Sequence, residues 1–198
     1  MDTRKVVLKC ISLLLFISLL PTILISIILL KIESPNLPVF FKQQRVGTNG
    51  QLFIMYKLRT MRPVSHEVYQ ELLKKNEASR IIFKIKEDPR ITRVGKWLRK
   101  FSIDEFPQLI NVLKGDMALV GPRPALVTEV VQYDPIHSRR LRVMPGCTGL
   151  WQVSGRSDVS FEEMIKLDLE YIEKQNVIFD LSILVRTILT VIYPRGAY

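Results

Sequence analysis

The chain begins with an apolar run that no charged residue interrupts. It extends from Cys10 to Leu30, a length of 21 residues, and about 20 apolar residues are enough for a helix to cross a bilayer. No small-residue cleavage site follows the run, so a cleaved signal peptide fits poorly. We predict a membrane helix over residues 1–33. Ser34-Pro-Asn-Leu-Pro38 then breaks the helix, and a second part covers residues 34–198.

Pro21 lies in the middle of the apolar run. Proline inside a helix removes one hydrogen bond and bends the axis. Basic residues flank the run on both sides, with Arg4, Lys5 and Lys9 before it and Lys31 after it, and basic residues tend to stay in the cytoplasm. The pattern therefore favours a re-entrant helix that is bent at Pro21 and leaves by the face it entered. A straight span is the alternative, because many spanning helices also contain proline.

Behind the run, two segments alternate between apolar and polar residues. Residues 39–45 and 51–61 are expected to form two strands joined at Gly47-Thr-Asn-Gly50, because Asn-Gly favours a hairpin turn. Side chains alternate across a strand, so Lys57 and Arg59 point the same way and would suit a phosphate. Taken alone, a solvated strand face explains the two residues better.

Apolar residues at helical spacing predict further helices. One of these helices opens with the capping box Ser160-Phe-Glu-Glu163. Another capping box, Ser102-Ile-Asp-Glu105, precedes a helix that we expect to end at Gly115. The predicted helices cover residues 65–75, 92–100, 102–115, 160–175 and 180–193. Together with the hairpin they indicate an α+β fold that is mostly helical, with one small sheet.

The last predicted helix, with Asp180 as its cap, leaves two interpretations open. Its polar residues fall on one side at helical spacing, and the rest of the helix is aliphatic. These polar residues are Ser182, Arg186, Thr190 and Tyr193. An amphipathic helix lying in the membrane interface fits this pattern. A core helix with a polar stripe fits it equally well.

Composition and charge narrow the classes of protein. The chain has 198 residues, enough for one domain with a core, and a net charge of +10 that favours an anionic partner. Two cysteines and two distant histidines, Cys10, Cys147, His66 and His137, give neither a disulfide framework nor a zinc site. No glycine-rich, lysine-terminated phosphate loop is present.

Asp104 and Glu105 are the leading candidates for chemistry. Acidic residues in the first turn of a helix often only cap it, and an isolated Ser-x-Asp-Glu would need no other explanation. Three features favour chemistry here. A helix N-terminus keeps a carboxylate ionised and attracts phosphate, arginines such as Arg99 flank the carboxylates, and two prolines hold Arg123 between them. An ionised aspartate can attack phosphorus, and Mg²⁺ prefers oxygen ligands that it shares with substrate phosphates.

Several stretches of the chain match one protein family. They are Ser34-Pro35, Pro38–Gly47, Tyr56–Met61, Asp88–Gly95, Arg99–Pro124 and Pro145–Arg156. In these stretches the chain resembles the bacterial sugar transferases, in particular the small monotopic phosphoglycosyl transferases. The resemblance covers nearly the whole chain, so its motifs are specific.

This resemblance implies a reaction at the bacterial inner membrane. Such enzymes move a sugar phosphate from a UDP-sugar to polyprenyl (undecaprenyl) phosphate and release UMP, through a covalent aspartyl intermediate, as the first membrane step of surface glycan assembly. It also implies Mg²⁺ as cofactor, a catalytic domain with interfacial helices on the cytoplasmic leaflet, and a re-entrant first helix broken at Pro21. No nucleic-acid partner is expected, and the oligomeric state, a homo-oligomer included, stays open.

The resemblance also assigns site residues. The family's acidic pair falls on Asp104 and Glu105, which are expected to bind the metal. Asp104 is the expected nucleophile, and Glu105 assists either through the metal or as a base. The residues that the resemblance predicts to bind the phosphates or the nucleotide are Lys57, Arg99, Arg123, Arg156 and Asp168. Arg59 is added to this set because it points the same way as Lys57 on the predicted strand.

The net charge allows a hypothesis of another class. A membrane-tethered protein could bind nucleic acid or anionic lipid through clustered basic residues, and that binding would fall steeply with salt. The residues that motivate it are Lys96, Arg99, Lys100, Arg139, Arg140 and Arg142. The family resemblance ranks this hypothesis well below the transferase.

Overall fold

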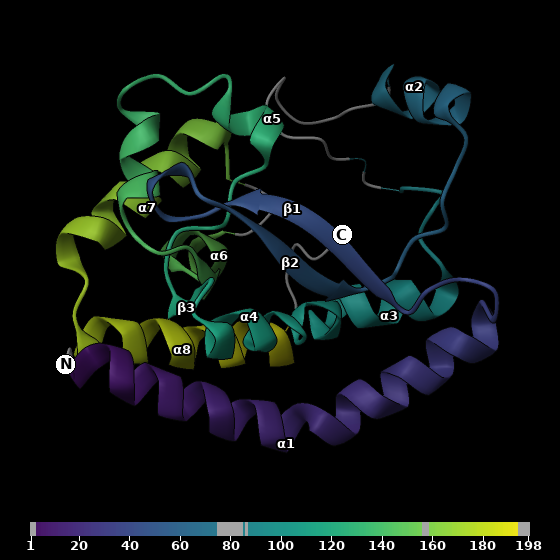
Figure 1. The fold of residues 1–198 in the computed structure, drawn as a ribbon, viewed down its shortest axis with the longest axis horizontal. Coiled ribbons are helices and arrows are strands. Elements are labelled where there is room, and N and C mark those ends of the chain that lie inside the picture. Colours follow the sequence, from purple (N-terminus) through teal and green to yellow (C-terminus); the bar gives the residue numbers. More distant parts are fainter. Residues whose placement is uncertain (1–2, 75–84, 86, 156–158, 194–198) are drawn as a thin grey trace.

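The computed structural model of the chain describes residues 3–74, 85, 87–155 and 159–193. Helices predominate and two small sheets lie among them (Figure 1), so the predicted α+β class is confirmed for these residues. The helices are α1 (Thr3–Glu33), α2 (His66–Lys74), α3 (Arg93–Lys100), α4 (Gln108–Lys114), α5 (Val127–Val130), α6 (Leu150–Ser154), α7 (Phe161–Lys174) and α8 (Val177–Ile192). The strands are β1 (Phe40–Val46), β2 (Leu52–Leu58), β3 (Ala118–Val120) and β4 (Gly146–Thr148), and the short 3-10 helices are η1 (Thr48–Gly50), η2 (Ile103–Glu105) and η3 (His137–Arg142).

The predicted hairpin is confirmed. β1 and β2 pair antiparallel along their whole length. Asn49 and Gly50 in the turn have φ angles of 54° and 82°, in the left-handed region that Asn and Gly tolerate best. β2 ends at Leu58, before the predicted end at Met61, whose backbone forms an isolated bridge with Ile91 instead.

A second sheet was not predicted. β3 and β4 pair in parallel, with Ala118 opposite Gly146 and Val120 opposite Thr148. Each strand has only three residues, which is too short for an alternating pattern to stand out in the sequence. This pair holds the loop that carries Arg123 beside the segment that begins at Pro145.

Three predicted helices are confirmed as α2, α3 and α7. α7 opens with the predicted capping box, in which the Ser160 hydroxyl accepts from the Glu163 N–H at 3.3 Å and the Glu163 carboxylate accepts from the Ser160 N–H at 3.0 Å. The helix therefore begins where its sequence satisfies the free backbone donors.

The capping box predicted at Ser102 is wrong. Ser102 has a left-handed backbone with φ of 54° and its side chain caps nothing, and Asp104 and Glu105 lie in η2, ahead of α4. α4 begins only after Pro107 and ends at Gly115, which has φ of 92° and closes the helix as predicted. The two carboxylates thus stand on a tight turn between α3 and α4.

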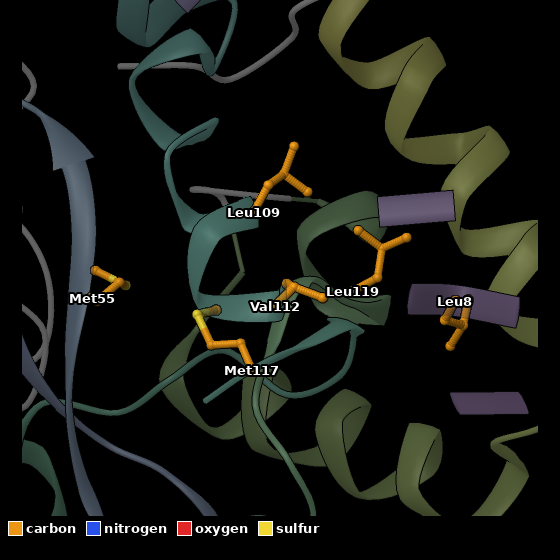
Figure 2. Close-up of a cluster of buried hydrophobic side chains, with 6 residues drawn as sticks. All are labelled: Leu8, Met55, Leu109, Val112, Met117 and Leu119. Atoms are coloured by element: carbon orange, nitrogen blue, oxygen red, sulfur yellow. The ribbon is translucent and has the colours of Figure 1, made fainter. Parts of the chain in front are cut away.

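α1 forms the base of the molecule. In Figure 1 it runs beneath α8, α4 and α3 and is visibly bent. Near its start, Leu8 joins a core cluster with residues of β2, α4 and β3 (Figure 2). The other members of that cluster are Met55, Leu109, Val112, Met117 and Leu119. The most apolar stretch of α1 has a mean hydropathy of 2.9 and is only 17% buried. Most of the surface of this stretch therefore faces away from the rest of the protein.

Both ends of α1 are tied to the same body. Near the N-terminus, the Arg4 guanidinium donates to Asp180 of α8 at 2.6 Å. At the other end, the Glu33 carboxylate accepts from the backbone N–H groups of Arg93 and Val94, at 2.8 and 3.1 Å, at the start of α3. The helix continues through Pro21 without interruption. Whether it re-enters one leaflet stays a prediction.

α8 is joined to the start of α1 by the ion pair of Asp180 with Arg4, and in Figure 1 it lies above the first half of α1. Asn176, not the predicted Asp180, caps α8 by accepting from the Phe179 N–H at 2.9 Å, and Asp180 is buried against Arg4. Large aliphatic side chains of α8 are exposed, namely Leu181, Val185, Ile188, Leu189 and Ile192. An exposed aliphatic side favours the interfacial interpretation of this helix over the core interpretation.

Candidate active site

Asp104 and Glu105 lie on η2, where the turn brings them next to β2. The Lys57 ammonium of β2 is 2.5 Å from a Glu105 carboxylate oxygen, and the Glu105 side chain remains 40% exposed. Asp104 is only 6% exposed. The pair thus combines one buried carboxylate with one that is open to a ligand and already neutralised by a lysine.

The two carboxylates differ in acidity. Burial raises the pKa of Asp104 to about 6, against the opposing effect of Lys57, and the neighbouring Glu105 charge adds to the rise. Burial also acts to raise the pKa of Glu105, but Lys57, with help from Arg123 and Arg99, outweighs it and lowers that pKa below its usual value. At neutral pH Asp104 is therefore ionised yet poorly stabilised, as suits a nucleophile.

A cleft of about 610 Å³ opens beside Asp104. Four of the predicted site residues line it, which are Lys57, Arg59, Arg99 and Asp104. The Arg59 guanidinium donates to the Pro38 carbonyl at 2.9 Å and lies over the Phe41 ring. The cleft therefore places three cations around the buried carboxylate, and it has room for a phosphorylated ligand.

Arg123 acts on Glu105 from another element, because its charge helps to lower the pKa of that carboxyl. Its guanidinium donates to Glu129 of α5 at 3.2 Å, and Glu129 is buried. Buried arginines hold the backbone around it: Arg45 donates to the Pro124 carbonyl at 2.9 Å, and Arg140 donates to the Arg123 carbonyl at 3.0 Å. The loop is therefore fixed by its proline residues and also by charged groups packed beneath it.

Gly121 lets this loop pack against the segment that follows Pro145. A Cβ atom on Gly121 would lie 2.6 Å from the Met144 carbonyl oxygen, and one on Gly146 would lie 2.1 Å from the Gly121 nitrogen. The Gly146 N–H donates to the Pro122 carbonyl at 2.8 Å across this contact. Two backbones can approach this closely only where side chains are absent.

Two predicted binding residues that the structure describes, Arg123 and Asp168, do not line the cleft. Asp168 of α7 is fully buried and forms an ion pair with Arg140, so it supports the Arg123 loop from below and does not line the cleft. Arg156 lies outside the described residues. The basic residues behind the hypothesis of nucleic-acid or lipid binding do not share one exposed surface, because Arg140 is buried and Arg99 lines the cleft.

The comparison with protein families fits this geometry. The sequence profile described as Bacterial sugar transferase matches residues 3–194. The chain belongs to the bacterial sugar transferase family. It is therefore an enzyme, and the acidic pair, the cleft and the Arg123 loop lie within the part that matches.

Curated relatives of this bacterial sugar transferase come from several bacteria. It is 47% identical over 161 residues to the galactosyl transferase CpsE of Streptococcus agalactiae, which is 81% of this chain and 36% of the relative. It is 42% identical over 192 residues to the exopolysaccharide production protein ExoY of Sinorhizobium fredii, and this alignment covers 95% of this chain and 84% of the relative. It is 45% identical over 172 residues to the undecaprenyl-phosphate galactose phosphotransferase of Salmonella typhimurium, and this alignment covers 85% of this chain and 36% of the relative. The alignments thus cover about a third of two of these relatives and most of the other.

Sequence reasoning missed several charged residues of the transferase's site. Asp88 and Arg90 line the cleft and are joined by a 2.5 Å ion pair. Arg45, Glu129 and Arg140 support the Arg123 loop from within the protein. Arg45 and Arg140 contact backbone groups 79 and 17 residues away in the sequence, so no local pattern indicated their role. Asp88 and Arg90 are only two residues apart, but nothing in their spacing shows that they line a cleft.

The acidic pair fits a magnesium ion that is shared with substrate. Asp104 and Glu105 supply oxygen donors, and Mg²⁺ commonly takes one or two carboxylates and completes its shell with water and substrate phosphates. Within the described ranges, no three His, Cys, Asp or Glu residues gather as a metal group. A cage built from protein ligands alone is therefore not indicated there.

Proposed function

We propose that this enzyme transfers a sugar phosphate from a UDP-sugar to polyprenyl phosphate and releases UMP. One observation carries the proposal: a buried, raised-pKa Asp104 lies beside Glu105 and Lys57 in a cleft lined by cations. The same chain carries an apolar base formed by α1 and α8. A nucleophile, a phosphate-binding cleft and a lipid-facing surface are the parts that this reaction requires.

The first step forms a covalent bond to Asp104. A carboxylate oxygen of Asp104 attacks the phosphorus nearest the sugar, and the bond from that phosphorus to UMP breaks with its electron pair on UMP. Arg99 and Lys57 line the cleft and offset the charge that develops on the diphosphate, and Arg123 adds its charge from the fixed loop. The product of this step is an acyl phosphate that carries the sugar.

The second step returns Asp104 to its starting state. A phosphate oxygen of the polyprenyl phosphate attacks the same phosphorus, the bond to Asp104 breaks, and the carboxylate is regenerated. The lipid product is a polyprenyl diphosphate sugar, ready for glycan assembly. The acceptor would reach the cleft from the cytoplasmic leaflet of the inner membrane, where α1 and α8 lie as a re-entrant and an interfacial helix.

Asp104 and Glu105 are the residues that would hold Mg²⁺. The chemistry that the ion supplies when bound is neutralisation of the diphosphate as UMP leaves. Lys57 keeps Glu105 ionised, and so ready to bind the ion. In the absence of a metal, the same lysine would hold the glutamate in place.

Mass spectrometry of a rapidly quenched reaction tests the covalent step. Purified enzyme, Mg²⁺ and a UDP-sugar, without lipid acceptor, should release one equivalent of UMP and add the mass of one sugar phosphate to the peptide that carries Asp104. UDP-galactose is the first donor to try, because the Salmonella relative is named a galactose phosphotransferase. A panel of other UDP-sugars then identifies the preferred sugar.

Two variants make this test specific. Asp104→Asn should fold, bind the donor and form no adduct, whereas Asp134→Asn, at an exposed carboxylate that does not line the cleft, should keep normal turnover. An Asp104→Asn variant with full activity would refute the assignment. An active enzyme that gives no adduct at any quench time would instead point to direct transfer without a covalent intermediate.

A further inference from the structure

A second cleft lies away from the active site. It has a volume of about 690 Å³ and is lined by the start of α1, the end of α4, β3 and part of α7, together with Arg142 and the two residues after it. It shares no lining residue with the cleft beside Asp104. In Figure 1 the N-terminus of α1 and β3 lie toward one end of the molecule and α2 and α3 toward the other. We refer to it as the N-terminal cleft.

The charge of the N-terminal cleft is entirely positive. Arg4, Lys5, Lys9 and Arg142 line it, and no aspartate or glutamate does. Arg4 is already engaged, because its guanidinium donates to Asp180. Lys5, Lys9 and Arg142 are exposed, and among the described residues no hydrogen bond or ion pair involves their side chains. Three cationic groups are therefore available to an anion from outside.

The walls of the N-terminal cleft are apolar. Leu8, Val112, Met117 and Leu119 belong to the core cluster of Figure 2 and also line this cleft. Val143 and Met144 extend the apolar wall toward Arg142. A cationic rim above an apolar floor matches a ligand that joins a phosphate to a hydrocarbon chain, and it fits a free inorganic anion less well.

The position of the N-terminal cleft indicates that such a ligand comes from the membrane. Lys5, Leu8 and Lys9 lie on the first turns of α1, and the next turns of the same helix expose Leu13, Leu14 and Ile17. The cleft therefore opens at the edge of the apolar base. Basic residues at the end of a membrane-embedded segment are where anionic head groups gather.

We infer that the N-terminal cleft binds the head group of an anionic phospholipid. Lys5, Lys9 and Arg142 surround the phosphate, and the upper part of an acyl chain lies against Leu8 and Met144. The bound lipid fixes the N-terminal end of α1 at the membrane surface. This inference rests on the membrane association of α1 and needs none of the transfer chemistry at Asp104.

Native mass spectrometry of the delipidated enzyme in a non-ionic detergent tests the inference. The protein is titrated separately with phosphatidylglycerol, phosphatidylcholine, polyprenyl phosphate and inorganic phosphate, without any UDP-sugar. Phosphatidylglycerol should fill one tight site in preference to phosphatidylcholine. The combined Lys5→Gln, Lys9→Gln and Arg142→Gln variant should weaken that binding by about tenfold or more.

A matched variant controls for net charge. Arg139→Gln, Lys166→Gln and Lys174→Gln remove the same three charges from an exposed face, where Lys174 and Arg139 have only surface ion pairs. This control should bind phosphatidylglycerol as the native chain does. The thermal unfolding midpoint of both variants should match that of the native chain, because all six positions are exposed.

Three results would overturn the inference. Equal losses in both triple variants would mean that net charge alone attracts the lipid. Polyprenyl phosphate binding that is as tight as phosphatidylglycerol and is lost in the cleft variant would assign the site to the acceptor. Displacement of the lipid by inorganic phosphate would make it a soluble anion site. Since no donor is present, a chain that fails as a transferase still gives a clear result.

Discussion

At the scale of single residues, Asp104, the proposed nucleophile, should destabilise the fold when it is ionised. Its pKa is raised from 3.8 to about 6 because the carboxylate is buried. The folded chain therefore holds the proton more tightly than the unfolded chain does. Stability is highest with Asp104 protonated, falls as the pH rises from about 4 to about 6, and stays reduced above that range.

Asp104→Asn should therefore make the protein more stable at neutral pH while it abolishes turnover. A shift of about two pKa units corresponds to about 2–3 kcal/mol in the free energy of unfolding. The gain should be full above about pH 7 and should vanish below about pH 4, because the native carboxyl is then protonated as well. Thermal unfolding in detergent with a metal chelator, measured from pH 4 to 8, checks the pattern.

Glu173→Gln at an exposed position of α7 provides the control for that experiment. Its unfolding midpoint should follow the native chain at every pH. If Asp104→Asn is less stable than the native chain at pH 7.5, then the ionised carboxylate stabilises the fold, and the account of Asp104 as a strained nucleophile is wrong.

At the scale of elements, the start of α3 joins the base to the active site. Every free N–H of its first turn has a partner: the Glu33 carboxylate takes those of Arg93 and Val94, and the Thr92 hydroxyl takes that of Gly95 at 2.9 Å. α3 also carries Arg99 into the cleft. The end of α1 thus helps to hold one wall of the site.

Glu33→Ala should destabilise the protein by about 1–2 kcal/mol, because two backbone donors lose their acceptor and the helix dipole loses its anion. Glu33→Gln, which keeps one acceptor oxygen, should lose about half as much. Hydrogen exchange should become faster at the start of α3 and at the end of α1, and Glu71→Ala on α2 should change neither. Unchanged exchange at α3 would contradict the capping role of Glu33.

Local patterns predicted elements well only where the chemistry that forms them is also local. Asn49 and Gly50 made the hairpin predictable, and Ser160 with Glu163 made the start of α7 predictable. The segment from Ser102 to Glu105 has the residue spacing of a capping box, but no α-helix begins there. Pro107 would fall beyond the first turn of a helix that began at Ile103, where it has no N–H to donate and its ring would clash.

The candidate site shows the same limit over longer distances. Asp104 and Glu105 could be named from a single segment, but their partner Lys57 is 48 residues away. The buried ion pair of Arg140 with Asp168 spans 28 residues. No local pattern carries such pairings, since they depend on how β2, η3 and α7 pack. Asp168 could therefore be singled out in the sequence while its place beneath the Arg123 loop could not.

At the scale of the whole molecule, the two anchors of α1 constrain its path through a membrane. A helix of 31 residues is about 46 Å long, more than enough to cross a bilayer. The first turn of α1 is anchored by the ion pair of Arg4 with Asp180, and its last turn by the hydrogen bonds that Glu33 accepts from the start of α3. Both partners belong to one packed body, so a straight crossing would place parts of that body on opposite sides of the membrane.

Both ends of α1 should therefore be reached from the cytoplasm alone. Single cysteines in place of Lys5 and Lys31, in a Cys10→Ser and Cys147→Val background, can be labelled with a membrane-impermeant maleimide. Both should react in inverted inner-membrane vesicles and neither in intact spheroplasts, because α1 enters and leaves by the same face. A cysteine at Ile17, in the exposed apolar stretch, should react in neither preparation. Labelling of position 5 from the periplasm while position 31 stays cytoplasmic would show a true crossing, and the anchors seen at the two ends could not then both exist in the membrane.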